Sequence, residues 1–134
     1  MSINNAYQSY QQNSVNTASP GELTLMLYNG CLKFIHIAKK AIDEKNIEVK
    51  NNNLIKAQNI IHELMVTLKE DYEVSKKIMP LYDYLYRRLV EANMKSDKAI
   101  LEEVEEFVTE FRDTWKQVIQ INRQKQYNQG GKVE

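Results

Sequence analysis

The chain has 134 residues, and its 18 Lys plus Arg balance its 18 Asp plus Glu, so the formal net charge at pH 7 is zero. This length fits one domain with one core, and the balanced charge gives no global field that would attract nucleic acid or an acidic membrane surface. Only four Gly and two Pro occur, which is too few for the many turns of an all-β fold.

The N-terminus and the cysteine content indicate the compartment. Residues 1–5 lack the basic-then-apolar order of a secretory signal, and no apolar run approaches the roughly 20 residues needed to span a bilayer. Cys31 is the only cysteine, so an intrachain disulfide is excluded. We therefore expect a cytoplasmic protein that does not insert into a membrane.

Residues 1–18 are rich in Asn, Gln and Ser. Tyr7, Tyr10 and Val15 are their main apolar groups. Because this segment is too polar to form a core, we expect a mobile N-terminal arm whose tyrosines can dock on another surface.

The first helix has clear start signals. Ser19 is the expected N-cap, Pro20 takes the first helical position and Glu22 completes a capping box. The helix is predicted to run to about Glu44, before the break at Lys45.

The second helix is predicted over residues 48–69, and its apolar seam consists of Leu54, Ala57, Ile61, Leu64 and Leu68. The third helix has two candidate starts, a cap at Ser75 or a first helical position at Pro80, and it is expected to end at Lys95.

Asp97 is the expected cap of the fourth helix. The seam of that helix consists of Ile100, Leu101, Val104, Phe107, Val108, Phe111, Trp115 and Val118. The helix is predicted to end near Asn122, which leaves residues 123–134 as a disordered C-terminal tail. Four long helices with short connections predict an all-α fold, an antiparallel up-and-down four-helix bundle over residues 19–122.

The apolar faces of these helices exceed what one core needs. A core-facing stripe covers somewhat more than about 100° of a helix. In the first helix that stripe is filled by Leu23, Leu27, Cys31, Phe34 and Ala38, and the residues expected to lie largely beyond it are Leu25, Tyr28, Leu32 and Ile35. Ile55 and Val66 are eleven residues apart, so they stack on one line away from the seam of the second helix.

The third helix is also broader than its core face requires. Its core residues are expected to be Leu81, Tyr82, Leu85 and Leu89, and Tyr84, Tyr86 and Val90 widen the face. Ordinary surface residues, or an irregular bundle that buries the first helix fully, would also explain single cases. Together the extra residues favour a partner-binding surface, to which we assign Leu25, Tyr28, Leu32, Ile55, Val66, Tyr84 and Tyr86.

Candidate catalytic and metal-binding residues are missing from the sequence. His36 and His62 fall on different predicted helices, and neither follows a Glu at the spacing of a di-iron bundle. The acidic run at residues 102–106 fits a solvated helix face, and Cys31 fits a small core residue. We predict a protein that is not an enzyme and that uses no metal and no cofactor.

Four blocks of sequence resemble one known family. The first, residues 17–30, reads TASPGELTLMLYNG, and the second, residues 53–61, reads NLIKAQNII. The third is LYDYLYRRLVEAN at residues 81–93, and the fourth is FRDTW at residues 111–115. Their order is similar to that of the FliS family of flagellar export chaperones.

The resemblance implies a four-helix bundle that binds the C-terminal segment of newly made flagellin in the cytoplasm. It also implies delivery to the export gate of the flagellar type III secretion apparatus, at a cytoplasmic domain of the FlhA type. In this family the N-terminal arm can cover part of the client groove, and N-terminal tyrosines are implicated in contact with the gate. The matching positions are Tyr7 and Tyr10.

Two other readings of the bundle stay open at this point. A histidine phosphotransfer bundle would use an exposed His36 or His62, although the residues that follow His62 are Glu63 and Leu64, unsuited to a phosphoryl group. A structural homo-oligomer would pack the extra apolar faces against copies of the chain, and a homodimer of this kind is compatible with a chaperone role.

Overall fold

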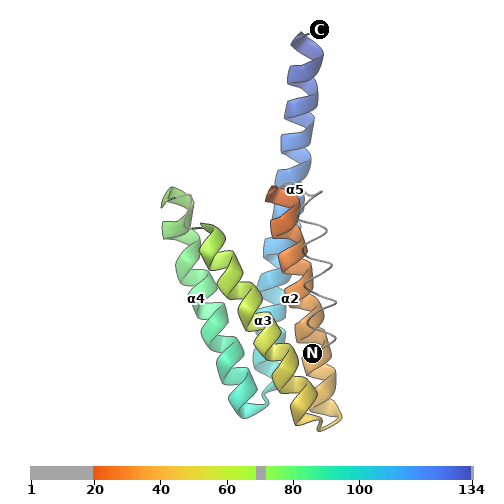
Figure 1. Ribbon diagram of the computed structural model, residues 1–134, viewed down its shortest axis with the longest axis vertical. Helices are drawn as coiled ribbons and strands as arrows, with labels where there is room; N and C mark the ends of the chain where they lie inside the picture. The colour runs from red at the N-terminus through yellow and green to blue at the C-terminus, as the bar shows by residue number, and fades with distance from the viewer. Residues whose placement is uncertain (1–19, 69–71, 134) are drawn as a thin grey trace.

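The structure is a computed structural model that describes residues 20–68 and 72–133, with side chains described over 21–68 and 75–125. Within these ranges the chain forms α2 (Pro20–Asp43), α3 (Ile47–Leu68), α4 (Tyr72–Lys95) and α5 (Lys98–Val133). Successive helices run in opposite directions (Figure 1). Each of α2 and α4 packs against both α3 and α5, which makes a closed ring of antiparallel neighbours. The predicted up-and-down four-helix bundle is confirmed, and its expected N-terminal arm at residues 1–18 lies outside the described residues.

Both short turns lie at the same end of the bundle, which we call the closed end (Figure 1). In the first turn, Lys45 has a φ of 57° and the Asn46 N–H donates to the carbonyl oxygen of Ala41 at 2.8 Å. This left-handed residue and the long backward hydrogen bond close the C-terminus of α2. The Oδ1 atom of Asn46 then accepts from the Val49 N–H at 3.2 Å and caps α3.

The second turn repeats this construction between α4 and α5. Ser96 has a φ of 50°, and the Asp97 N–H donates to the carbonyl oxygen of Ala92 at 3.1 Å. The Oδ1 atom of Asp97 accepts from the N–H groups of Ala99 and Ile100 at 2.9 and 3.4 Å. The predicted Asp97 cap is therefore confirmed.

The helix starts differ from prediction in one place. α2 begins at Pro20 as expected, while Ser19 of the predicted capping box lies outside the described residues. α4 begins at Tyr72, before both candidate starts, and carries Pro80 inside the helix. Proline normally interrupts a helix, but the turn before it is held by Ile78, which packs against the core.

α5 is longer than predicted. The sequence predicts an end near Asn122 and a disordered tail over residues 123–134, whereas in the structure α5 continues to Val133 and projects beyond the other helices (Figure 1). Residues 119–129 contain no Gly and no Pro, and their Gln, Arg and Lys residues favour helix, so local propensity accounts for the extension over these residues but not for its continuation through Gly130 and Gly131.

The core occupies the middle of the bundle and includes Cys31, Leu54, Ile61, Leu85, Leu89 and Leu101. Two expectations about α2 are wrong: Tyr28 and Ile35, placed beyond the core stripe, are buried in the core. Because α3 and α5 cover α2 from two sides, its buried face is wider than a single stripe. The opposite error concerns Leu81 and Phe107, expected in the core but 43% and 38% exposed. No helix over the described residues is long and apolar enough to cross a membrane.

Candidate functional site

A large apolar pocket opens at the end of the bundle opposite the two turns. Its volume is about 730 Å³. All four helices border it, from the first turns of α2, the last turn of α3, the first half of α4 and the middle of α5. The residues that line this open-end pocket are Gly21, Thr24, Tyr28, Leu64, Thr67, Leu68, Ile78, Leu81, Tyr82, Phe107, Glu110, Phe111, Thr114, Trp115 and Val118.

Three aromatic rings from three helices form one side of the open-end pocket. The rings of Tyr28 and Phe111 are stacked with centroids 6.1 Å apart, and the ring of Tyr82 meets Phe111 edge-on at 5.7 Å. The hydroxyl groups of Tyr28 and Tyr82 form a buried hydrogen bond of 2.5 Å. Burial raises the pKa of both hydroxyls, so both keep their protons at neutral pH.

The start of α2 is fastened to α5 beside this pocket. The Trp115 indole N–H donates to the carbonyl oxygen of Gly21 at 2.8 Å. A Cβ atom at Gly21 would lie 3.4 Å from the side chain of Ile119, an ordinary van der Waals distance, so α2 and α5 are in contact here. One turn further along, Arg123 pairs with Glu22. These contacts fix one wall of the pocket.

The structure does not gather the seven residues predicted from sequence into one groove. Tyr28 is only 5% exposed and borders the open-end pocket from inside the core. Leu25, Leu32 and Tyr86 are half-buried, with Leu32 and Tyr86 packed against the core.

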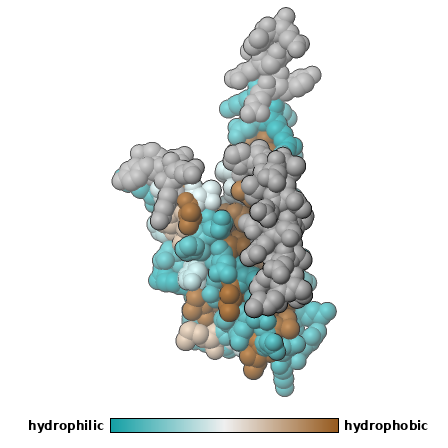
Figure 2. Space-filling model, viewed as in Figure 1, coloured by the Kyte–Doolittle hydropathy of each residue, from teal (hydrophilic) through white to brown (hydrophobic). Residues whose placement is uncertain are grey.

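Ile55 and Val66 lie on α3 and are 48% and 49% exposed, as expected for surface residues. Figure 2 shows that apolar residues on this face of the molecule form separate patches between hydrophilic ones. The predicted surface therefore consists of several small patches in the structure, and its role in binding stays a prediction.

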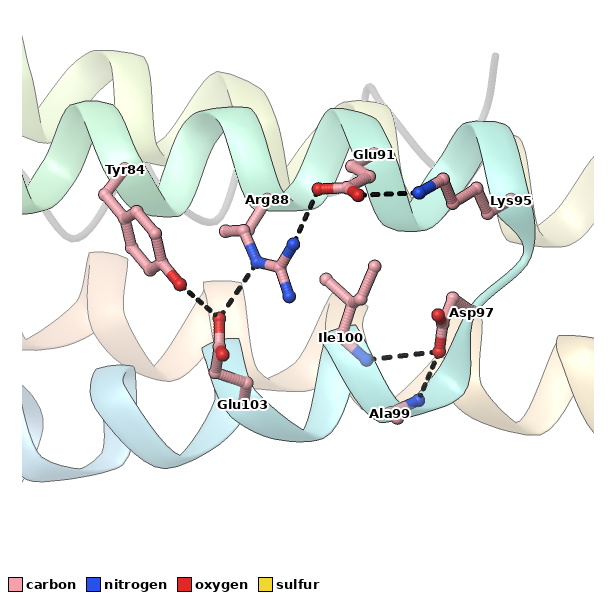
Figure 3. A network of polar contacts seen from close by, with 8 residues as sticks. All are labelled: Tyr84, Arg88, Glu91, Lys95, Asp97, Ala99, Ile100 and Glu103. Carbon is pink, nitrogen blue, oxygen red and sulfur yellow. Dashed lines mark hydrogen bonds and ion pairs between the residues drawn. The ribbon is translucent and has the colours of Figure 1, made fainter.

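Tyr84 belongs to a polar network between α4 and α5 (Figure 3). Its hydroxyl donates to Glu103 at 2.9 Å, and the Arg88 guanidinium donates to the same carboxylate at 3.0 Å. These hydrogen bonds lower the pKa of Glu103. The Tyr84 ring also meets the Phe107 ring edge-on with centroids 6.3 Å apart, so an aromatic pair continues from the pocket onto the outer face.

A second hollow, of about 830 Å³, lies between α2 and α5. Leu32 and Ile37 are its apolar residues, and the rest of its lining is largely charged. Four glutamates from the acidic run and the turn beyond it contribute, namely Glu102, Glu105, Glu106 and Glu110. This composition matches a solvated helix face better than a binding site for an apolar partner.

Several residues of the open-end pocket were not assigned to a binding surface from sequence. Phe107, Phe111, Trp115 and Val118 were placed in the core seam of the fourth helix, and Leu81 in the core face of the third. Their helical periodicity is that of core residues. The sequence held no signal that distinguishes them, because α4 runs alongside this part of α5 and periodicity does not report how closely two helices pack.

The described residues show no arrangement suited to catalysis. His36 and His62 are exposed on separate helices, and no group of three or more His, Cys, Asp or Glu could hold a metal ion in the part of the chain that the structure describes. Burial raises the pKa of the Cys31 thiol to about 12, so the thiolate that a nucleophile requires is not formed near neutral pH.

Comparison with known proteins gives a consistent result. Residues 3–122 match the family described as "Flagellar protein FliS". The "Flagellar secretion chaperone FliS" of Bacillus subtilis (strain 168) is 60% identical over 131 residues, which is 98% of each chain. The protein of the same description from Escherichia coli (strain K12) is 35% identical over 79% of this chain and 80% of that one. A solved structure titled "Crystal structure of flagellar chaperone from bacteria" superposes with a TM-score of 0.71 over 87% of this chain and 96% of the other; at 18% identity, it supports the fold alone.

Proposed function

The chain belongs to the FliS family of flagellar secretion chaperones, and from this premise we propose that it holds the disordered C-terminal segment of flagellin in the cytoplasm before export. No catalytic step is part of this role. Holding the segment would prevent premature polymerisation and keep flagellin ready for the type III export gate.

The observation that carries this proposal is the open-end pocket. It is bordered mainly by apolar side chains from all four helices, and Leu81 and Phe107 at its edge are 43% and 38% exposed. Apolar side chains left in contact with water in a pocket of about 730 Å³ favour a partner with an apolar face, such as an amphipathic helix.

The physical chemistry of a disordered client suits a chaperone without a nucleotide cycle. A segment that folds on binding typically buries about 1,000–3,000 Å², and ordering it costs about 2–5 kcal/mol or more. The pocket has 15 lining residues, fewer than the roughly 20–30 that an interface of this size uses on each side, so we propose that the client also contacts the patches on the outer helix faces, among them Ile55 and Val66. A complex of this kind is stable yet releasable, because part of its interaction energy is offset by ordering.

The delivery step is assigned to the N-terminal arm. Tyr7 and Tyr10 lie outside the described residues, and we propose that they contact the cytoplasmic domain of the export gate. A homodimer that masks the apolar surfaces in the absence of client is compatible with the same role. Sedimentation of the chain with and without client distinguishes a masking dimer, which dissociates on binding, from a structural oligomer, which persists.

Co-purification with flagellin tests the central claim. Full-length flagellin should form a soluble complex of fixed stoichiometry, and flagellin without its C-terminal segment should not. Full affinity for the truncated flagellin would reject the proposal.

Matched substitutions locate the binding surface. Leu81→Asp places a charge in the open-end pocket, Ile55→Asp places one on the α3 patch, and Met94→Asp is a control because Met94 is 81% exposed near the closed end. We expect Leu81→Asp to weaken binding by at least about tenfold through the cost of burying an unpaired charge, and Ile55→Asp to weaken it less. Met94→Asp should bind like the unmodified chain. Circular dichroism checks that each variant stays helical, and unfolding of the Ile55 variant would assign Ile55 to the core.

A further inference from the structure

The buried tyrosine pair in the open-end pocket has hydrogen-bonding capacity that the described chain does not use. Each tyrosine hydroxyl has one hydrogen to donate and lone pairs to accept. Tyr28 and Tyr82 share one hydrogen bond of 2.5 Å, which uses one hydrogen of the two. Among the residues that the structure describes, neither hydroxyl has a second partner, so one O–H donor and at least one acceptor lone pair remain.

The position of this pair limits where a partner can come from. Tyr28 and Tyr82 are 5% and 2% exposed, and both border the open-end pocket. Both side chains belong to the apolar core, in which Leu85 is fully buried. The pocket is therefore the open space from which a complementary group can reach the pair. The one O–H donor that the mutual hydrogen bond leaves unused costs free energy if an apolar occupant covers it, so an occupant that brings an acceptor is favoured over a purely apolar one.

We propose that the Tyr28 and Tyr82 hydroxyls bind a carboxamide side chain, Asn or Gln, carried on the apolar face of the client helix; this inference rests on the proposed function. The carboxamide oxygen accepts the remaining O–H, and the carboxamide NH₂ donates to the oxygen of the other hydroxyl. The pair thus selects one polar residue at a fixed position within an otherwise apolar binding face.

Other polar side chains fit this position less well. A carboxylate or an ammonium group would have to leave water for an apolar pocket without an opposite charge, which is costly. A serine or threonine hydroxyl offers one oxygen for both hydrogen bonds. A carboxamide presents an acceptor atom and a donor atom side by side, which matches two adjacent hydroxyl oxygens. Backbone groups of a client helix are already engaged in their own hydrogen bonds.

A scan of the client combined with substitutions in the chaperone tests this inference. In the C-terminal segment of flagellin, each Gln is replaced by Met and each Asn by Leu, one at a time, and affinity for the unmodified chaperone is measured by calorimetry. We expect one replacement to weaken binding by about tenfold, since it leaves the tyrosine pair without its partner. The Tyr28→Phe/Tyr82→Phe double variant should weaken binding of the unmodified segment by a similar factor, and the critical replacement should have no further effect on it.

The controls separate this inference from the proposed function. Thr109→Val removes a half-buried hydroxyl outside the open-end pocket, one that donates to the carbonyl oxygen of Glu105, and it should change affinity by less than about twofold. If the double variant is not helical, the client scan against the unmodified chaperone decides alone. A client scan without any sensitive Asn or Gln, or a folded double variant that binds as tightly as the unmodified chain, overturns the carboxamide site while the chaperone function stands. Failure of the unmodified chain to bind the segment at all overturns both.

Discussion

The two ends of the bundle differ in the side chains that they present. At the closed end, several polar side chains bridge the helices: the Lys50 ammonium donates to the carbonyl oxygen of Asn93 at 2.8 Å and to the Ser96 hydroxyl at 2.6 Å, and Lys98 pairs with Asp43, although the buried Oδ1 atom of Asn93 has no partner among the described residues. At the open end, apolar and aromatic side chains border a pocket. The difference suggests that stability is concentrated where the turns are and that the opposite end is kept available for a partner.

Truncation of a core leucine near the closed end should give the largest loss in the free energy of unfolding. Leu101 is fully buried in the core near the start of α5. Leu101→Ala should therefore lower the free energy of unfolding by about 2–5 kcal/mol. The matched variant Leu81→Ala removes the same atoms at the open end, where the side chain is 43% exposed, and should cost less than about 1 kcal/mol. Urea titration of both variants gives the difference. Equal losses would mean that the open end contributes as much stability as the closed end.

The Lys50 contact gives a second, smaller test. Its ammonium group binds the C-terminal end of α4, where the helix dipole favours a positive charge. Lys50→Met leaves the acceptors at Asn93 and Ser96 without this donor and should cost about 1–3 kcal/mol. Lys40→Met on the exposed face of α2 serves as the control. An increase in stability of the Lys50 variant would show that desolvation of the ammonium outweighs its hydrogen bonds.

Alkaline pH should lower the free energy of unfolding through Cys31, which lies in the core between the two ends. Burial raises the pKa of the Cys31 thiol from its ordinary 9.0 to about 12 in the folded chain. Between these values the folded state holds a proton that the unfolded state has lost, so stability is unaffected by Cys31 below pH 9 and falls as pH rises above it. From pH 9 to pH 10 the unmodified chain should lose about 1 kcal/mol more than Cys31→Ala. Parallel pH profiles for the two chains would show that the thiol is accessible to water.

The sequence predicted the bundle because the signals that start a helix and set its apolar face are local. Pro20 and Asp97 mark helix starts through backbone groups a few residues away, and the apolar period of each helix fixes which residues can face inward. The start of α4 was missed because residues 70–73 were interpreted as a polar connection, although Asp71, a preferred N-cap residue, directly precedes Tyr72 in the sequence. The full length of α5 was missed because the prediction ended the helix where its apolar seam ends, whereas the helix continues beyond that seam.

The candidate site was harder to predict than the fold. Tyr28 was expected beyond the core and is buried, whereas Leu81 was expected in the core and is exposed. Exposure depends on how many neighbours cover a helix at each height of the bundle. Periodicity assigns a residue to a face but does not say how closely a neighbouring helix packs against it. The Tyr28–Tyr82 hydrogen bond joins residues 54 positions apart, and no pattern in either helix indicates it.

The indole of Trp115 makes the open end optically visible. It is the only tryptophan in the chain, it borders the open-end pocket, and its N–H is bound to the carbonyl of Gly21. Tryptophan emission therefore comes from one place, the junction of α2 and α5. A guest that enters the pocket displaces water beside this ring and should shift its emission to shorter wavelength, so occupancy could be followed in real time with no attached dye.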